Sequence, residues 1–159
     1  MRVGHGFDAH RLVRGRPLWL GGVRIPHSRG LEGHSDADVL AHAVGDALLG
    51  ALGAGDLGTH FPSSDERWRD APGALLLGQI MAMVAREGLA VSHVDTTVIA
   101  QEPRLAKHRL EIQTSLAKLL GVDAARVNVK LKSTDGLGAL GRAEGIAAQA
   151  VVLLIGSAP

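Results

Sequence analysis

An almost uninterrupted apolar segment near the end of the chain constrains the fold more than any other feature. Residues 146–155 read IAAQAVVLLI, in which Gln149 is the single polar side chain. Consecutive apolar positions predict a strand buried on both faces, because a strand with one solvent-facing side alternates apolar and polar residues. Helices of the same chain or another subunit can supply the cover, and the sequence leaves both open. The fold must therefore be built around a sheet.

The remaining segments show the periodicities of strands and helices. The elements we expect, in chain order, are a strand at 2–10, a hairpin within PLWLGGVRIP, a helix capped by Ser35, a loop at 53–70, a helix ending before Gly88, a strand at 94–100, a helix ending at Gly121 and a strand at 127–131. With the apolar segment, this order predicts an α/β fold (an α+β sandwich) with a mixed four-stranded sheet, helices on one face and a small hairpin. We expect one domain, 1–159.

Composition restricts the classes of function. Lys and Arg number 17 against 16 Asp and Glu, so the formal charge of +1 gives no basis for bulk nucleic-acid binding. The absence of cysteine excludes disulfides and thiolate metal sites. The first residues lack the apolar core of a signal peptide, and no apolar run approaches the roughly 20 residues of a membrane span. We expect a cytoplasmic protein that binds neither nucleic acid nor membranes.

Three residues offer ligand atoms suited to a metal site without thiolates. Asp8 and His10 share one face of the first predicted strand, because they are two residues apart, and His42 lies one turn inside the first predicted helix. Three protein ligands with a fourth position open are typical of a catalytic zinc ion. On spacing alone, ordinary surface or core histidines also explain the pattern, so both interpretations remain open.

Eight short motifs along the chain carry more information than this spacing. In order they are GHGFDAH (4–10), GGVRIP (21–26), HSDADV (34–39) followed by His42, DALLGA (46–51), GDLGTHFP (55–62), IAQEP (99–103), VNVK (127–130) and GRAEGIA (141–147). Together they resemble the 2-C-methyl-D-erythritol 2,4-cyclodiphosphate synthase family of the non-mevalonate isoprenoid pathway. Eight matches in order are far more specific than any one of them.

The resemblance implies a phosphorus–oxygen lyase that needs no protein nucleophile. In this family the 2-phosphate of 4-diphosphocytidyl-2-C-methyl-D-erythritol 2-phosphate attacks the β-phosphate and CMP leaves, so catalysis rests on positioning and charge stabilisation. The resemblance makes Asp8, His10 and His42 the ligands of one zinc ion per subunit. It makes Asp135 the ligand of a second divalent ion, Mg²⁺ or Mn²⁺, bound with the diphosphate.

The resemblance also assigns residues to catalysis and substrate binding. His34, Ser133 and Asp135 would be catalytic, with His34 and Ser133 donating to phosphate oxygens. The segments 56–58 and 61–65 would bind and close over the erythritol, while 100–106 and 132–135 would bind the nucleotide; alone, such segments are also ordinary turns and solvated charges. The full set of expected substrate contacts is Asp8, His10, His34, Ser35, Asp56, Leu57, Gly58, Phe61, Pro62, Ser63, Ser64, Asp65, Ala100, Gln101, Glu102, Pro103, Arg104, Leu105, Ala106, Lys132, Ser133, Thr134, Asp135 and Arg142.

Three residues depart from the family's pattern. Asp135 stands where Glu is typical, and a side chain one methylene shorter can still coordinate a hard cation directly or through water. Lys132 stands where Thr is common and adds a cation beside the phosphates. Ala139 replaces a typical Phe near a central apolar channel, which leaves open whether an isoprenoid diphosphate binds there with the help of Arg142.

The family is a homotrimer with active sites between subunits, and the 146–155 strand is what such packing needs. Two other functions remain. The first is a zinc phosphoesterase that hydrolyses a CDP-linked substrate, which its open-chain product would identify. The second is a non-catalytic nucleotide-binding or metal-binding oligomer, in which Lys132, Asp135 and Ala139 mark lost activity.

Overall fold

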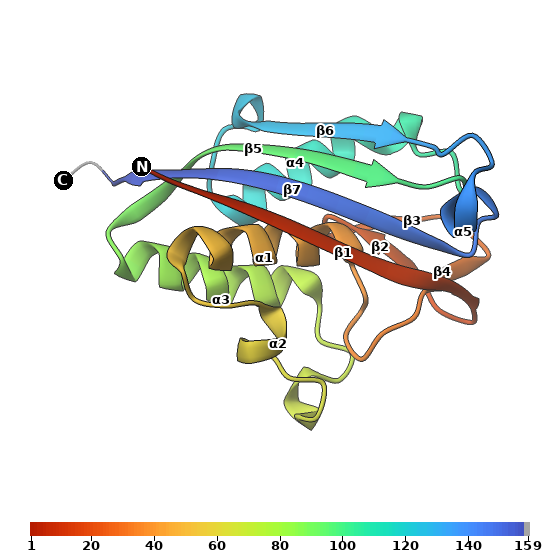
Figure 1. The fold of residues 1–159 in the computed structure, drawn as a ribbon, viewed down its shortest axis with the longest axis horizontal. Helices are drawn as coiled ribbons and strands as arrows, with labels where there is room; N and C mark the ends of the chain where they lie inside the picture. Colours follow the sequence, from red (N-terminus) through yellow and green to blue (C-terminus); the bar gives the residue numbers. More distant parts are fainter. Residues whose placement is uncertain (158–159) are drawn as a thin grey trace.

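The chain folds into a five-stranded sheet, with helices on one face and a separate two-stranded hairpin (Figure 1). The computed structural model describes residues 1–157, with strand order β4-β1-β7-β5-β6. The strands are β1 (Arg2–Arg14), β4 (Arg29–Leu31), β5 (Leu89–Ile99), β6 (Val127–Lys132) and β7 (Gly145–Gly156). The β5–β6 pair is parallel and the other pairs are antiparallel, so the sheet is mixed as predicted.

The predicted number of four strands was wrong, because a fifth strand lies at one edge. β4 pairs antiparallel with the end of β1, where Leu12 lies opposite Leu31. Three residues are too few to show a strand's two-residue period, and Gly30 in the middle contributes no side chain to it.

Three helices form the layer that covers the sheet: α1 (Val39–Leu52), α3 (Gly73–Arg86) and α4 (Arg109–Leu120). Two single turns, α2 (Leu57–His60) and α5 (Gly138–Gly141), lie in connecting segments, with 3-10 turns at Glu66–Trp68, Ala106–His108 and Ala124–Arg126. Two of these short turns, α2 and the 3-10 turn at Glu66–Trp68, lie in the segment 53–70, which was expected as a loop. α4 ends where predicted, since Gly121 adopts the left-handed C-cap conformation at φ 66°.

The first helix begins later than predicted, because Asp38 rather than Ser35 caps it. Asp38 Oδ1 accepts a hydrogen bond from the Ala41 amide at 3.0 Å. The same buried carboxylate accepts hydrogen bonds from the Gly21 and Gly22 amides at 2.8 and 2.7 Å. These glycines form the turn of the predicted hairpin, β2 (Leu18–Leu20) and β3 (Val23–Ile25). A carboxylate that satisfies three amides stabilises this helix start.

Two glycines let α1 lie close against β1. A Cβ on Gly4 would be 1.8 Å from the carbonyl oxygen of Ala47, and one on Gly6 would be 2.0 Å from that of Ala43. Any side chain at either position would therefore separate helix from strand. Because inward-facing residues alternate along a strand, the next two after Gly6 are Asp8 and His10.

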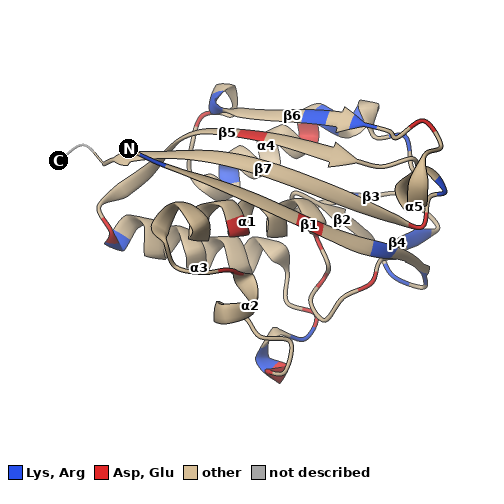
Figure 2. Cartoon of the chain, in the orientation of Figure 1, with Lys and Arg blue, Asp and Glu red and all other residues tan. Residues whose placement is uncertain are grey.

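β7, the middle strand of the sheet, carries no charged residue (Figure 2). Its residues 145–148 are all buried, but from Gln149 onward exposed and buried positions alternate. Within one chain, helices cover one face only, so the second half of this strand is not buried on both faces. Of the two kinds of cover that the sequence left open, another subunit remains for the second face.

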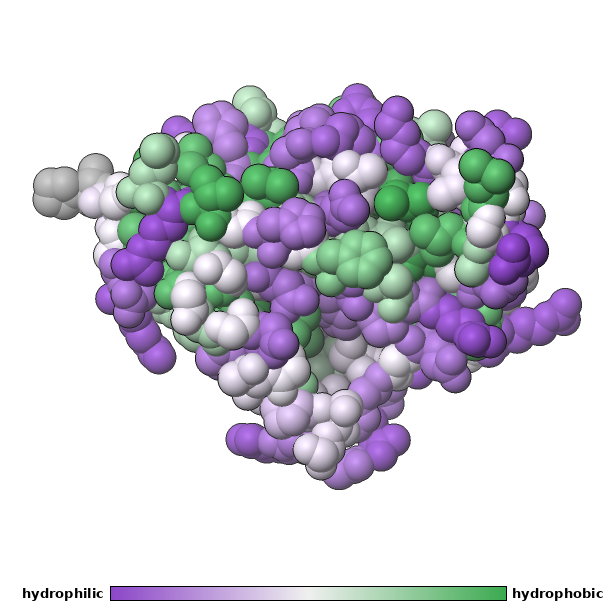
Figure 3. All heavy atoms as spheres, viewed as in Figure 1, coloured by the Kyte–Doolittle hydropathy of each residue, from purple (hydrophilic) through white to green (hydrophobic). Residues whose placement is uncertain are grey.

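The uncovered face of the sheet carries exposed apolar side chains, namely Val3, Phe7, Val151 and Ile155. Figure 3 shows apolar surface over these strands, interrupted by polar groups. Within residues 1–157, no helix combines the length and the apolar character that crossing a membrane requires.

Candidate active site

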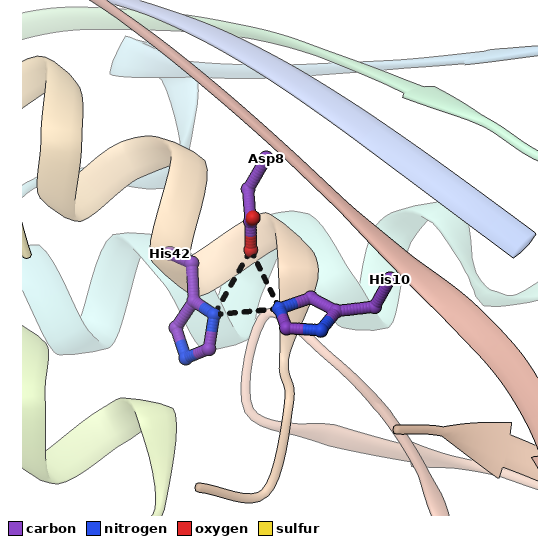
Figure 4. Close-up of side chains that lie close together, drawn as sticks. All are labelled: Asp8, His10 and His42. Atoms are coloured by element: carbon purple, nitrogen blue, oxygen red, sulfur yellow. Dashed lines mark hydrogen bonds and ion pairs between the residues drawn. The ribbon is translucent and has the colours of Figure 1, made fainter. Parts of the chain in front are cut away.

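Asp8, His10 and His42 converge beneath the sheet, on the side that α1 covers (Figure 4). Asp8 Oδ2 lies 2.9 Å from His10 Nε2 and 3.0 Å from His42 Nδ1. The two ring nitrogens are 3.3 Å apart. The close packing of β1 on α1 therefore directs three ligand-competent atoms at one point.

The outer nitrogen of each histidine is held by the surrounding chain. His10 Nδ1 donates a hydrogen bond to the Glu32 carbonyl oxygen at 2.6 Å, so a neutral His10 presents Nε2 without a proton. His42 Nε2 lies 3.1 Å from Ser35 Oγ. The Ser35 carbonyl oxygen in turn accepts a hydrogen bond from Arg16 Nη2 at 2.6 Å. Such outer partners orient the ligands of metal sites.

The three converging atoms fit a metal ion. Tetrahedral ligands at Zn–N and Zn–O distances of about 2.0–2.1 Å lie about 3.3 Å apart, and the observed separations reach 3.3 Å. Burial alone would raise the pKa of Asp8, but its hydrogen bonds with His10 and His42, and their charges, hold that pKa well below its ordinary value. The ionised carboxylate and two imidazole nitrogens are a donor set that suits zinc.

A cavity of about 350 Å³ opens onto these three side chains. It is lined by nine of the residues expected to bind substrate: Asp8, His10, His34, Ser35, Asp56, Leu57, Gly58, Phe61 and Ser63. Pro62, Ser64 and Asp65 belong to the same loop but do not line the cavity. The Asp65 carboxylate is instead paired with Arg67. One wall therefore comes from β1 and α1, and the other from the segment around α2.

The cavity is also lined by His42, the predicted metal ligand, and by three residues that were not predicted from the sequence: Asp46, Trp68 and Leu76. Asp46 follows His42 by one helical turn, a spacing that could have revealed it. Trp68 packs edge-on against Phe61, with ring centroids 4.9 Å apart. This aromatic pair gives the loop an apolar side facing the cavity.

The residues expected to bind the nucleotide surround a second cavity of about 400 Å³ at the ends of β5 and β6. It is lined by Ala100, Gln101, Pro103, Arg104, Leu105, Ala106, Leu131, Lys132, Ser133 and Asp135. The two cavities share no lining residue. Ser133 Oγ donates a hydrogen bond to Asp135 Oδ1 at 2.9 Å, so these two groups lie side by side.

Besides Pro62, Ser64 and Asp65, three more of the expected contacts lie outside both cavities: Glu102, Thr134 and Arg142. Glu102 is paired with Arg29 at 3.3 Å, and Thr134 Oγ1 donates to the Leu137 carbonyl oxygen at 2.7 Å. Arg142 is paired with Glu144 at 2.7 Å. Within one chain, therefore, the structure does not bring these three side chains to the expected site.

The chain resembles proteins of known family along almost its whole length. The model of the YgbB family matches residues 1–155. The 2-C-methyl-D-erythritol 2,4-cyclodiphosphate synthase of Geobacillus sp. (strain WCH70) is 56% identical over 96% of this chain and 97% of its own length. A solved structure of a 2C-methyl-D-erythritol-2,4-cyclodiphosphate synthase, described as the CDP-bound form, superposes with a TM-score of 0.89 at 38% identity, covering 97% of this chain and all of that one.

A longer protein contains the same fold as one part. The structure of the bifunctional IspDF from Campylobacter jejuni gives a TM-score of 0.92 at 41% identity over 96% of this chain. This chain spans 42% of that protein.

Proposed function

Since the chain belongs to the YgbB family, we infer that it has the activity for which its relatives are named, 2-C-methyl-D-erythritol 2,4-cyclodiphosphate synthesis. It is a phosphorus–oxygen lyase of isoprenoid biosynthesis. It converts 4-diphosphocytidyl-2-C-methyl-D-erythritol 2-phosphate into the cyclic diphosphate and CMP. The convergence of Asp8, His10 and His42 at the floor of a cavity is the observation that carries this function at the level of the site.

The chemistry asks the protein to hold two phosphates of one substrate in reacting position and to stabilise the charge that develops. Asp8, His10 and His42 fit a zinc ion, which would act as a Lewis acid and as a template for phosphate oxygens. His34 also lines the cavity, and in this proposal it donates a hydrogen bond to a phosphate oxygen. Ser35 contributes its hydroxyl beside His42.

The erythritol part is proposed to lie between α1 and the segment around α2. Asp56 Oδ1 accepts hydrogen bonds from the Thr59 amide and hydroxyl at 2.9 and 2.7 Å, which leaves Oδ2 for a substrate hydroxyl. Phe61 and Ser63 of the loop 61–65 line the cavity, and we expect this loop to close over the bound substrate. Closure would exclude water, which favours cyclisation over hydrolysis.

The cytidine diphosphate part is proposed to bind the second cavity. Segment 100–106 would hold the nucleotide, and Ser133 would donate to the transferring phosphate. Asp135 fits a second divalent ion as a single carboxylate ligand, because magnesium commonly keeps several waters. Lys132, exposed at the same cavity, adds a positive charge for the diphosphate.

A homotrimer with active sites between subunits is supported by two features of the single chain. The uncovered face of the sheet presents Val3, Phe7, Val151 and Ile155 to solvent, and apolar surface of this kind is typical of subunit contacts. The metal-site cavity and the nucleotide cavity are separate in one chain. In a trimer, the nucleotide cavity of one subunit can lie beside the metal-site cavity of its neighbour. Sedimentation equilibrium should give three chains per particle, and a monomer at micromolar concentration would contradict the proposal.

Phosphorus NMR with zinc, magnesium and the CDP-linked 2-phosphate tests the function. We expect a cyclic diphosphate and CMP in equal amounts. The product should be lost in His42→Ala and kept in His93→Ala, which removes an exposed histidine of β5 that lines neither cavity. Open-chain phosphates with CMP would indicate a phosphoesterase, and CMP binding without turnover a non-catalytic oligomer. Neither alternative is supported by the family match or the relatives.

A further inference from the structure

One acidic side chain in the first cavity has no part in the function described above. Asp46 lies on α1 one turn after His42 and shares the cavity wall with Asp8 and Asp56. We propose that Asp46 is a positioning residue, which fixes α2 and through it the Asp56 carboxylate that binds the erythritol hydroxyls. The inference rests on the proposed function and adds a residue to its machinery.

The first step is a direct hydrogen bond between two segments of the site. Asp46 Oδ1 accepts the Leu57 amide at 2.8 Å. Leu57 is the first residue of α2, and the first amides of a helix have no partner within it. A helix of four residues is too short to be stable alone. Asp46 therefore anchors α2 to the rigid helix that also carries His42.

A second contact places α2 against the same part of α1. A Cβ on Gly45, the neighbour of Asp46, would lie 3.3 Å from Leu57 Cδ2 and 3.1 Å from Ile80 Cδ1. The Leu57 side chain therefore rests in the space that this glycine leaves. At the other end of α2, His60 Nε2 lies 2.8 Å from the Ala54 carbonyl oxygen. Of these contacts, the Asp46 hydrogen bond is the one that holds the backbone of Leu57, the residue that follows Asp56.

The orientation of Asp56 follows from the position of α2. Asp56 is the N-cap of this turn, and its Oδ1 is engaged by Thr59. If the start of α2 moves, the cap residue and its remaining oxygen move with it. We therefore expect loss of the Asp46 contact to act on the binding of the erythritol part rather than on the metal or the nucleotide.

The charge of Asp46 is not what the contact requires. Burial, and the negative charges of Asp8 and Asp56, raise the pKa of Asp46 above its ordinary value. Asparagine has the same shape and still offers an oxygen to the Leu57 amide. Asp46→Asn should therefore keep the contact, whereas Asp46→Ala removes it.

Three variants compare this hydrogen bond with a similar one elsewhere. Asp123→Ala is the control, because Asp123 Oδ1 also accepts a backbone amide, that of Ala125 at 2.9 Å, and lines neither cavity. For each variant we would measure KM, kcat, zinc per chain, CDP affinity, and hydrogen exchange of the peptide containing residues 56–61. Exchange reports local opening of α2 without any need for turnover.

We expect Asp46→Ala to raise KM about tenfold, as loss of one hydrogen bond would. Exchange in 56–61 should become faster, while zinc content and CDP affinity stay at the parental level. Asp46→Asn and Asp123→Ala should resemble the parent in KM.

Three results would overturn the inference: an unchanged KM and exchange in Asp46→Ala, a loss of zinc in that variant, or equal defects in Asp46→Asn and Asp46→Ala. A parental protein that forms no cyclic product refutes the proposed function instead. The exchange comparison then still decides whether Asp46 holds α2.

Discussion

Replacing Gly6 by alanine should push α1 away from the sheet and disturb the metal-site cluster. The new Cβ would lie 2.0 Å from the Ala43 carbonyl oxygen and 2.6 Å from the Ala47 amide nitrogen, whereas real Cβ contacts essentially never fall below 3.0 Å. Both neighbours are backbone atoms of a helix, which cannot rotate aside as a side chain can. The helix must therefore retreat by about 1 Å, since a close-packed interior has no free volume to absorb the overlap.

Such a shift has two consequences of different size. Overpacking of a core costs typically about 1–3 kcal/mol, and we expect the upper end because the clash is with backbone. His42 precedes Ala43 on the displaced helix, so its Nδ1 moves relative to the ligand atoms of Asp8 and His10, now 3.0 and 3.3 Å away. A displacement of about 1 Å at a reacting centre lowers kcat/KM on the order of 100-fold.

The assay is urea unfolding together with zinc titration against a chelator and steady-state kinetics. Gly78→Ala is the matched control, because an added Cβ there meets no atom within 4 Å and the residue is exposed on α3. That variant should be more stable by roughly 1 kcal/mol, since alanine favours helix over glycine. A Gly6→Ala protein with parental stability and zinc affinity would refute the view that this close approach builds the site.

Three other predictions concern a residue that supports the metal site and one residue in each cavity. Arg16→Ala removes the hydrogen bond to the Ser35 carbonyl oxygen and should weaken zinc binding about tenfold, measured by chelator competition; parental affinity would show that this support is dispensable. Trp19→Phe leaves Trp68 as the one tryptophan, and its emission should change on addition of the cyclic product but not of CMP, because Trp68 lines only the first cavity; an equal response to CMP would contradict this placement. Lys132→Ala should raise the magnesium concentration that half-maximal turnover needs, since the variant loses a cation beside Asp135; an unchanged requirement would exclude that role.

Long periodic segments could be read from the sequence, and short or locally determined ones could not. The alternation in β1 correctly placed Asp8 and His10 on one face, because a two-residue period fixes the side on which each residue lies. β4 was missed because its three residues show no period of their own and are defined as a strand only by pairing with β1. The helix start was misplaced because Asp38 gains two further donors from the hairpin turn, a tertiary effect that no local cap rule contains.

For the candidate site, too, the sequence predicted some residues and missed others. Asp8, His10 and His42 were named from the sequence because the family resemblance assigns them, whereas their spacing alone left ordinary histidines open. Asp46 was not, because an acidic residue on a helix is usually a solvated one. Its importance depends on the Leu57 amide, whose position is set by the fold of a segment without periodicity. Likewise, the pairing of Arg142 with Glu144 within one chain could not be foreseen from the motif that contains both.

The geometry of α1 and β1 connects the metal site to the uncovered face of the sheet. In β1, Gly4, Gly6 and Asp8 lie on the face toward α1, and Val3 and Phe7 lie on the opposite face. Shifting the register of this strand by one residue would therefore expose the ligands and bury the apolar side chains. Only the face that carries Gly4 and Gly6 leaves room for α1 to pack this closely. The strand therefore cannot adopt the shifted register. The close approach that assembles the metal ligands thus also determines which apolar residues remain available to another subunit.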